Sequence, residues 1–290
     1  MLIQWAESLG DEGQLVALPR PALVRLMNYE GGEVSFAETA RTKAMARDVA
    51  RLNEIIGATD IDLGIGTKGW GGIIRIERAN GKAACMYPSD QSFRKFRGSF
   101  ERGGRLYGGG WQQVPKDCRK SLTINGNATE EHDYEALHPC MLYALEGKQV
   151  DPQTVYELPG CEDLSRGLQK RAVNTLINAR STTAARRSLM DNRKGKGVPS
   201  ADAQRLIEGT FKRHPDITSR FGRDMGAKLQ AIDSEIARDV CNELTGKGKP
   251  VLPVHDSFLV RKADSDQLRG AMNDAYERRF RTRANIKLTA

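Results

Sequence analysis

The stretch that most constrains the fold is Val251-Leu-Pro-Val-His-Asp-Ser-Phe-Leu-Val260. Apolar, strand-forming residues flank a polar trio, His255-Asp256-Ser257, and this pattern predicts a strand, a tight turn and a second strand. An aspartate at the tip of an apolar hairpin is costly unless a cation binds it, and a divalent metal ion is the usual cation. A plain solvent-exposed turn, in which Asp and Ser are favoured, explains the same pattern. A metal site would therefore need a second carboxylate.

Asp133 is the candidate for that second carboxylate. The run from Glu130 to Ala144 passes from the end of a predicted strand into an apolar helix, with Asp133 at the junction. The alternative reading is an N-cap aspartate, which stabilises a helix by about 1 kcal/mol. Two carboxylates and a triphosphate can together hold two Mg²⁺ ions, one activating a 3′-hydroxyl and the other stabilising the leaving pyrophosphate.

A long helix is predicted between the two aspartates, over residues 162–190. Four polar residues recur at every fourth position of this helix: Arg166, Lys170, Asn174 and Asn178. Leucine and alanine recur with the same spacing on nearly the opposite side. A face with a guanidinium, an ammonium and two amides, and with no acid, suits phosphates and base edges.

The charge distribution indicates a polyanionic partner. The formal net charge is +8, and residues 180–223 hold eleven Lys and Arg against four Asp and Glu, so most of the excess lies in this segment. This concentration predicts that the partner is nucleic-acid phosphate. The five cysteines form no CxxC pair, which argues against a zinc site or a disulfide framework. Short apolar runs and an N-terminus without a basic region predict a cytoplasmic protein with no membrane contact.

The remaining elements are predicted from periodicity and turn signals. Residues 22–27 and 36–56 are expected to be helical, and residues 71–87 to form a hairpin around Asn80-Gly81. Phe93, Phe96 and Phe100 recur at helical spacing among basic residues, which favours the buried face of a helix over a nucleic-acid surface. The glycine-rich segment 103–116 predicts a loop, where Trp111 and Tyr107 either stack on bases or pack inside. Residues 229–244 and the segment after Ala263 predict two more helices.

Taken in order, these motifs resemble the family A DNA polymerases and their relatives, the single-subunit phage RNA polymerases. Gly104-Arg-Leu106, Gln112-Gln-Val-Pro115 and Arg119 are similar to the segment before the first catalytic motif, and Asp133-Tyr-Glu-Ala-Leu-His138 to that motif. The Arg166, Lys170 and Asn174 spacing resembles the helix that grips the incoming triphosphate. His255-Asp-Ser257 resembles the last motif in its RNA polymerase form. The segment 133–139 and the spacing of Lys170 and Asn174 also resemble family B DNA polymerases.

The resemblance implies an α+β fold of the right-hand type, with an antiparallel-sheet palm and helical fingers. The expected division is an N-terminal helical, thumb-like region with a hairpin (1–99), a palm segment with the first motif (100–150), fingers (151–226), and a palm segment with the last motif and a C-terminal helix (227–290). It implies a minimal DNA-dependent DNA polymerase without proofreading, using two Mg²⁺ ions, with Mn²⁺ able to substitute. The expected partners are a DNA primer–template, dNTPs and accessory replication proteins.

The resemblance also implies roles for individual residues. Asp133 and Asp256 would be catalytic and would bind metal together with Tyr134. The nucleotide-binding set would comprise Arg166, Lys170, Asn174, Asn178 and His138. The nucleic-acid-binding set would comprise Arg105, Gln113, Arg119, Gln230 and His255.

The choice of sugar is predicted from His138, which by this resemblance crowds a ribose 2′-hydroxyl and so favours dNTPs. Its other reading is a helix-start residue before Pro139. Ser257 points the opposite way, towards RNA polymerases. Two other functions therefore stay open: a primase or single-subunit-type RNA polymerase on the same palm, and a non-catalytic basic nucleic-acid-binding protein.

Overall fold

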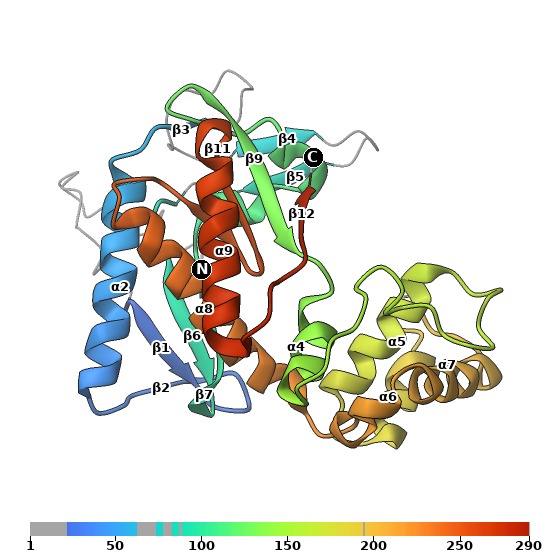
Figure 1. Cartoon of the computed structure of the whole chain (residues 1–290). Helices are drawn as coiled ribbons and strands as arrows, with labels where there is room; N and C mark the ends of the chain where they lie inside the picture. Colours follow the sequence, from blue (N-terminus) through green and yellow to red (C-terminus); the bar gives the residue numbers. More distant parts are fainter. Residues whose placement is uncertain (1–21, 63–73, 78–82, 87–88, 194, 290) are drawn as a thin grey trace.

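An antiparallel sheet carries both predicted aspartates. The computed structural model describes residues 22–62, 74–77, 83–86, 89–193 and 195–289, and six strands of this part form the sheet (Figure 1). Its order is β10 (Leu252–Val254), β11 (Ser257–Arg261), β9 (Asn127–Tyr134), β8 (Thr123–Ile124) and β3 (Ile61–Asp62), and β12 (Ile286–Thr289) also pairs with β9. The predicted hairpin at Val251–Val260 is confirmed as β10 and β11. The C-terminal tail, for which the sequence predicted no strand, forms β12.

A second sheet corrects two helix predictions. Its order is β2 (Glu33–Val34), β1 (Val24–Met27), β6 (Phe93–Arg97) and β7 (Ser99–Tyr107), with β1 and β6 parallel. The helices predicted over residues 22–27 and around Phe93 to Phe100 are therefore wrong. The spacing of the phenylalanines matched a helix because a turn at Gly98, with φ of +73°, and a bulge at Phe96 shift the alternation of the strands.

Three helices pack together beside these sheets. They are α2 (Ala40–Gly57), α8 (Met225–Thr245) and α9 (Ser265–Phe280), and all three were predicted from apolar periodicity. Helix α8 packs against β7, and both α2 and α9 pack against α8 (Figure 1). Arg94 of β6 is buried and reaches α8, where it donates to Ser234 at 2.9 Å and to Glu235 at 2.7 Å. These contacts join the second sheet to the helix that borders the candidate site.

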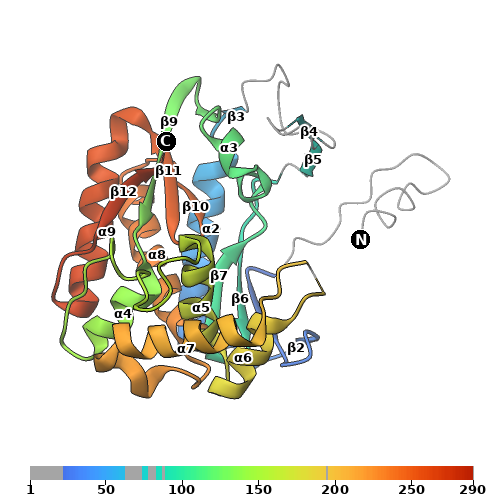
Figure 2. The same ribbon diagram turned by 90° about the vertical axis from the view of Figure 1, so that its right-hand side faces the viewer.

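A helical lobe projects from the sheet-bearing part of the molecule (Figures 1 and 2). It contains α5 (Arg166–Asn178), α6 (Thr182–Met190), α7 (Ser200–Arg213) and the 3₁₀ helix η2 (Pro215–Arg220), and α4 (Leu137–Leu145) leads towards it. The single helix predicted over 162–190 is wrong, because the chain turns between α5 and α6. Ser181 caps α6, and the carbonyl of Ala179 accepts from the main-chain N–H of Asp224 at 2.8 Å.

The N-terminal segment is not the helical region that was expected. Within the described part of residues 1–99, α2 is accompanied by strands β1 to β6 and the start of β7. The predicted hairpin is confirmed as β4 (Ile74–Glu77) paired with β5 (Ala83–Met86), although its turn lies outside the described residues. The expected boundary at residue 99 falls in the tight β6–β7 turn, so this boundary divides a single sheet.

The glycine-rich segment is partly strand. Gly104 lies in β7 with φ of +87°, and a Cβ there would meet Phe96 at 2.6 Å and Ser234 at 2.7 Å. The short helices η1 (Gly110–Gln113) and α3 (Lys116–Arg119) follow, and η3 (Lys262–Asp264) precedes α9. Trp111 is fully buried and donates from Nε1 to the carbonyl of Pro253 at 2.9 Å, so it packs inside and does not stack on bases. Within the described ranges, no helix is both long enough and apolar enough to cross a membrane.

Candidate active site

Asp133 and Asp256 lie side by side at one end of the antiparallel sheet. Asp133 is opposite Ser257 in the β9–β11 register, and the main-chain N–H of Tyr134 donates to the carbonyl of Asp256 at 3.3 Å. His255 adopts φ of +61°, a left-handed conformation that makes the two-residue turn possible. The N-cap reading of Asp133 is wrong, because α4 begins at Leu137 and Ala136 occupies its N-cap.

The two aspartates open into a cleft of about 340 Å³ between the sheet, α4, α5 and α8. Nine residues predicted from the sequence line this cleft: Arg105, Asp133, Tyr134, His138, Lys170, Asn174, Asn178, Gln230 and Asp256. They come from five separate parts of the chain, β7, the β9–α4 segment, α5, α8 and the β10–β11 turn. The fold therefore brings residues that are far apart in the sequence into one site.

The electrostatics at Asp133 are those of a carboxylate with an acidic neighbour. Burial, followed by the charge of Asp256, raises the pKa of Asp133 from its ordinary 3.8 to about 6, although Lys287 opposes this rise. The Nζ of Lys287 is 3.8 Å from Oδ2 of Asp133. A bound cation would relieve the repulsion between the two aspartates.

A Mg²⁺ site fits these donors if the substrate completes it. Among the described residues, no group of three or more His, Cys, Asp or Glu side chains is placed to hold a metal ion. Mg²⁺ in phosphoryl-transfer sites is commonly bound by one or two carboxylates together with substrate phosphates and water. Asp133 and Asp256 supply two such carboxylates. The Tyr134 hydroxyl donates to the carbonyl of Met272 at 2.7 Å inside the core, so only its main-chain carbonyl remains for a metal.

The polar face of α5 (Arg166, Lys170, Asn174 and Asn178) borders the other side of the cleft. Lys170, Asn174 and Asn178 line it, but Arg166 does not. The Nζ of Lys170 is 5.5 Å from the centre of the Tyr156 ring, and the Arg166 guanidinium is 5.7 Å from the same ring. The buried Tyr156 therefore supports both cations through its aromatic face.

His138 is held in place by a buried carboxylate. Its Nε2 is 2.9 Å from Oδ2 of Asp233, and the same oxygen also accepts hydrogen bonds from Nε and Nη2 of Arg105. Asp233 lies on α8, one turn after Gln230. Burial would lower the pKa of Arg105, but the Asp233 carboxylate raises it, so the guanidinium stays charged. His138 and Arg105 are thus oriented together at the wall of the cleft.

His255 packs beside the cleft against Tyr107, with ring centres 5.6 Å apart. Its Nδ1 is buried and has no hydrogen-bond partner in the described part of the protein. Burial, followed by the charge of Arg105, lowers the pKa of His255, so the ring is neutral at pH 7. A neutral imidazole is compatible with a contact to nucleic acid and does not act as a cation.

Three predicted nucleic-acid contacts lie outside the cleft lining: His255, Arg119 and Gln113. The Arg119 guanidinium forms a paired interaction with Glu131, with both N–O distances 2.9 Å, and only 12% of its side chain is exposed. Ser257 donates to the same Glu131 at 2.6 Å. Arg119 and Ser257 therefore have structural partners beneath the hairpin. Gln113 is exposed at the end of η1.

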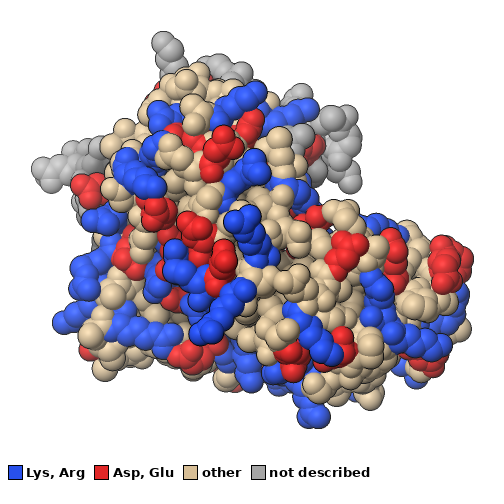
Figure 3. All heavy atoms as spheres, viewed as in Figure 1, with Lys and Arg blue, Asp and Glu red and all other residues tan. Residues whose placement is uncertain are grey.

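Several of the basic side chains concentrated in residues 180–223 are paired with nearby groups of the protein. Five of its arginines form ion pairs or hydrogen bonds with nearby groups: Arg186 with Ser200, Arg193 with Asp191, Arg205 with Asp163, Arg213 with Thr154 and Arg220 with Glu146. On the face shown in Figure 3, blue basic residues are interspersed with red acidic ones. The segment is basic in sequence, but it forms no uniform positive patch on this face.

Three residues of the site were not predicted from the sequence: Tyr156 and Lys287, which line the cleft, and Asp233, which holds His138 from behind its wall. Asp233 follows Gln230 by nearly one helical turn, and this spacing was the available signal. Lys287 lies in the tail that forms β12, and nothing local distinguishes it from other surface lysines. Tyr156 lies between α4 and α5, outside every element predicted from the sequence.

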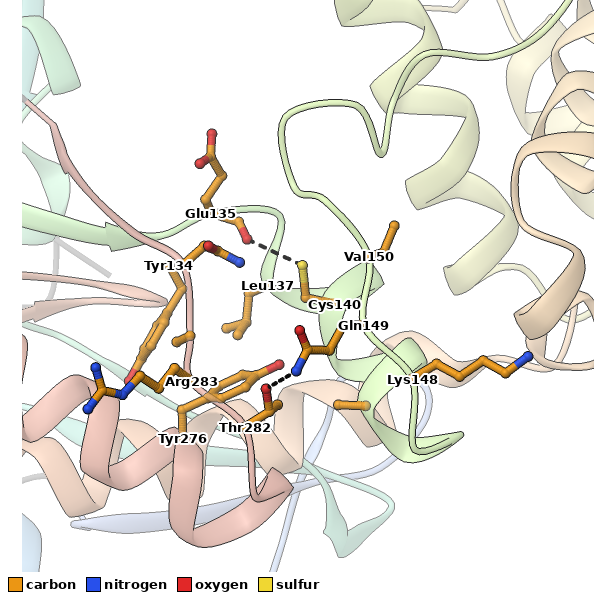
Figure 4. A pocket seen from close by; sticks show the side chains of 13 residues that line it. Tyr134, Glu135, Leu137, Cys140, Lys148, Gln149, Val150, Tyr276, Thr282 and Arg283 are labelled. Carbon is orange, nitrogen blue, oxygen red and sulfur yellow. Dashed lines mark hydrogen bonds between the residues drawn. The ribbon is translucent and has the colours of Figure 1, made fainter.

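A second, smaller pocket lies behind the end of β9 (Figure 4). Gln149 donates to Thr282 across it at 2.7 Å, and the Cys140 thiol contacts the carbonyl of Glu135 at 3.7 Å. Burial raises the pKa of Cys140 to about 12, so its thiol is a poor nucleophile at pH 7. Residues of two segments line this pocket: the connector between α9 and β12, and the segment after α4 that leads into the helical lobe.

Comparison with known proteins gives a distant likeness to a solved structure. No family model matches the chain, and no curated protein matches it. The POL domain of Pol1 from M. smegmatis, solved in complex with DNA primer-template and dNTP, is 14% identical, with a TM-score of 0.43. The match covers 86% of this chain and 52% of that chain, so this chain spans about half the length of that one. A likeness of this size decides nothing about activity.

Proposed function

We propose that this protein is a template-directed nucleotidyltransferase, a minimal DNA-dependent DNA polymerase that adds dNTPs to a primer 3′-hydroxyl. One observation carries the proposal. The cleft places the carboxylates of Asp133 and Asp256 on one side and Lys170, Asn174 and Asn178 on the other. Paired carboxylates facing a cationic and amide-bearing helix suit a metal-bound triphosphate. In this proposal residues 100–150 and 227–290 form the palm and residues 151–226 the fingers.

The residues of the cleft divide into three roles. Asp133 and Asp256, with the main-chain carbonyl of Tyr134, would hold two Mg²⁺ ions, or Mn²⁺ in their place. When bound, these ions supply activation of the 3′-hydroxyl and stabilisation of the leaving pyrophosphate. Lys170 would neutralise charge on the triphosphate, and Asn174 and Asn178 would bind its oxygens or the base. Gln230, Arg105 and His255 would contact the primer–template.

His138 supports dNTPs as the substrates. Its ring lines the cleft and is held by Asp233, so it does not rotate freely away from the sugar. Ser257, the residue that pointed to RNA polymerases, is only 5% exposed, and its hydroxyl donates a hydrogen bond to the buried Glu131. This internal partner explains the serine without any role in sugar choice.

Primer extension tests the proposal. The protein is incubated with dNTPs or NTPs on primed and unprimed DNA and RNA templates, with Mg²⁺ or EDTA. We expect Mg²⁺-dependent extension of primed DNA by dNTPs. Asp133→Asn and Asp256→Asn are each expected to lower the rate about 10³-fold, equivalent to about 4 kcal/mol, while DNA binding is retained. Asp216→Asn, at an exposed ion pair with Lys148 outside the cleft, is the control.

The other two functions are distinct outcomes of the same assay. Synthesis from NTPs on an unprimed template would identify a primase or RNA polymerase. DNA binding with no synthesis under any condition, unchanged in the two aspartate variants, would identify a non-catalytic binding protein.

A further inference from the structure

The C-terminal strand brings a lysine to the proposed metal-binding carboxylates. In the β12–β9 pairing, Lys287 is opposite Asp133. Its Nζ is 3.8 Å from Oδ2 of Asp133 and 3.9 Å from Oε1 of Glu135, and its side chain lines the same cleft as Asp256. A positive charge therefore stands at the oxygen that would bind Mg²⁺.

We infer that Lys287 is a built-in counter-cation that competes with the metal ion for Asp133 and so sets the metal affinity of the site. The inference rests on the proposed function. Mg²⁺ binds a carboxylate oxygen at about 2.0–2.1 Å, so an ammonium within about 4 Å of the same oxygen repels it. Binding of the metal requires the ammonium to withdraw or its repulsion to be overcome.

The side chain of Lys287 is suited to such a withdrawal. It is 40% exposed, whereas Asp133 is 20% exposed, so the lysine can swing towards solvent while the aspartate stays in place. A lysine carries its charge on a flexible stem with several rotatable bonds. The ion pair stabilises the fold weakly, because partly exposed pairs contribute little.

Strand formation alone does not require a lysine at this position. The neighbouring residues Ile286, Leu288 and Thr289 continue the β12–β9 ladder, and the ladder depends on main-chain groups. Any strand-forming residue at position 287 would serve the sheet. Removing the charge is therefore a clean test, because the pairing of β12 should survive it.

Direct Mn²⁺ binding, measured by electron paramagnetic resonance without nucleotide, tests the inference. Lys287→Met is expected to bind Mn²⁺ about three- to tenfold more tightly than the native protein. Lys287→Arg, which keeps the charge, should stay within about twofold of native. Lys262→Met is the matched control, because Lys262 is 3.8 Å from Glu130 on the same sheet but outside the cleft.

A second readout uses thermal unfolding. Mn²⁺ should raise the melting temperature of Lys287→Met by more than that of the native protein. If Lys287→Met folds poorly by circular dichroism in EDTA, Lys287→Gln replaces it in both measurements, and loss of folding in both variants would overturn the inference by giving Lys287 a structural role.

The remaining outcomes separate the inference from the proposed function. Equal Mn²⁺ affinity in native protein and Lys287→Met overturns the inference, and the proposed function stands if Asp133→Asn abolishes Mn²⁺ binding. Weaker dNTP binding by Lys287→Met with unchanged Mn²⁺ affinity assigns the lysine to the triphosphate and also overturns the inference. No Mn²⁺ binding by either the native protein or Lys287→Met overturns the inference. The proposed function, in which substrate phosphates complete the metal site, is then decided separately by primer extension.

Discussion

Asp133 of β9 and Asp256 of the β10–β11 turn lie at one end of the sheet, where the main-chain N–H of Tyr134 donates to the carbonyl of Asp256 at 3.3 Å. The side chains are close enough for the Asp256 charge to add to burial in raising the pKa of Asp133 to about 6. The fold thus holds together two charges that repel each other. This arrangement costs stability in the metal-free protein and favours a bound cation.

The first prediction concerns stability and pH. The folded protein holds a proton on Asp133 more tightly than the unfolded chain does, because the pKa is about 6 against 3.8. In EDTA, stability should therefore rise as the pH falls from above 6 towards 4, and fall as the pH rises through 6. Asp133→Asn should stabilise the metal-free protein at pH 7.5 by up to about 3 kcal/mol, and by about half as much at pH 5.

Urea unfolding in EDTA at pH 5 and pH 7.5 measures this difference. Asp216→Asn, which removes an exposed aspartate, should show no comparable gain at pH 7.5. The same stabilisation of Asp133→Asn at both pH values would show that the pKa of Asp133 is not raised.

The second prediction concerns Lys170. Lys170→Ala removes the cation that the polar face of α5 presents to the cleft, and should reduce kcat/KM for dNTPs about 10- to 100-fold, as expected for a hydrogen bond to a charged group. Single-nucleotide incorporation gives both parameters. Lys212→Ala, at an exposed lysine on α7 of the same lobe, is the control and should stay near native. Equal losses in the two variants would indicate general charge attraction to DNA.

The third prediction concerns the sugar. His138→Gly should raise the use of NTPs relative to dNTPs by about tenfold or more, because the ring held by Asp233 would no longer crowd the 2′-hydroxyl. Competition between labelled dNTP and NTP at one template position measures the ratio. His138→Gln keeps most of the bulk and should keep most of the discrimination. A native protein that uses both sugars equally would rule out this role.

The fourth prediction concerns the partners of Glu131. Ser257→Ala removes one hydrogen bond to Glu131 and should destabilise the protein by about 1 kcal/mol. Arg119→Met leaves the buried carboxylate without its guanidinium partner and should cost about 3 kcal/mol or more. Chemical denaturation measures both. The ratio of NTP to dNTP use should be unchanged in Ser257→Ala, and a shift in that ratio would return the serine to the role of a sugar-selecting residue.

The local pattern of apolar and turn residues correctly predicted the elements whose buried face is set by their own residue spacing. The helices at 40–57 and 225–245 and the hairpin around Asp256 fall where apolar spacing and turn residues placed them. Prediction failed where one spacing fits two structures. Phe93, Phe96 and Phe100 have helical spacing, but they lie on β6 and β7. These two strands form a hairpin, and β6 also pairs with β1. The helix predicted over 162–190 breaks because carbonyls near its middle bond to residues 222 and 224.

The sequence by itself determined the chemical content of the site: two aspartates at strand ends and a helix face with Lys170 and two asparagines. Only the tertiary structure decided which polar groups are satisfied inside the protein and which reach the cleft. It turned Arg119 and Ser257 inward onto Glu131, and it brought Asp233 to His138 and Lys287 to Asp133. The reason is physical. Periodicity specifies which face a side chain occupies, but its partners depend on long-range strand pairing and helix packing, which no local pattern contains.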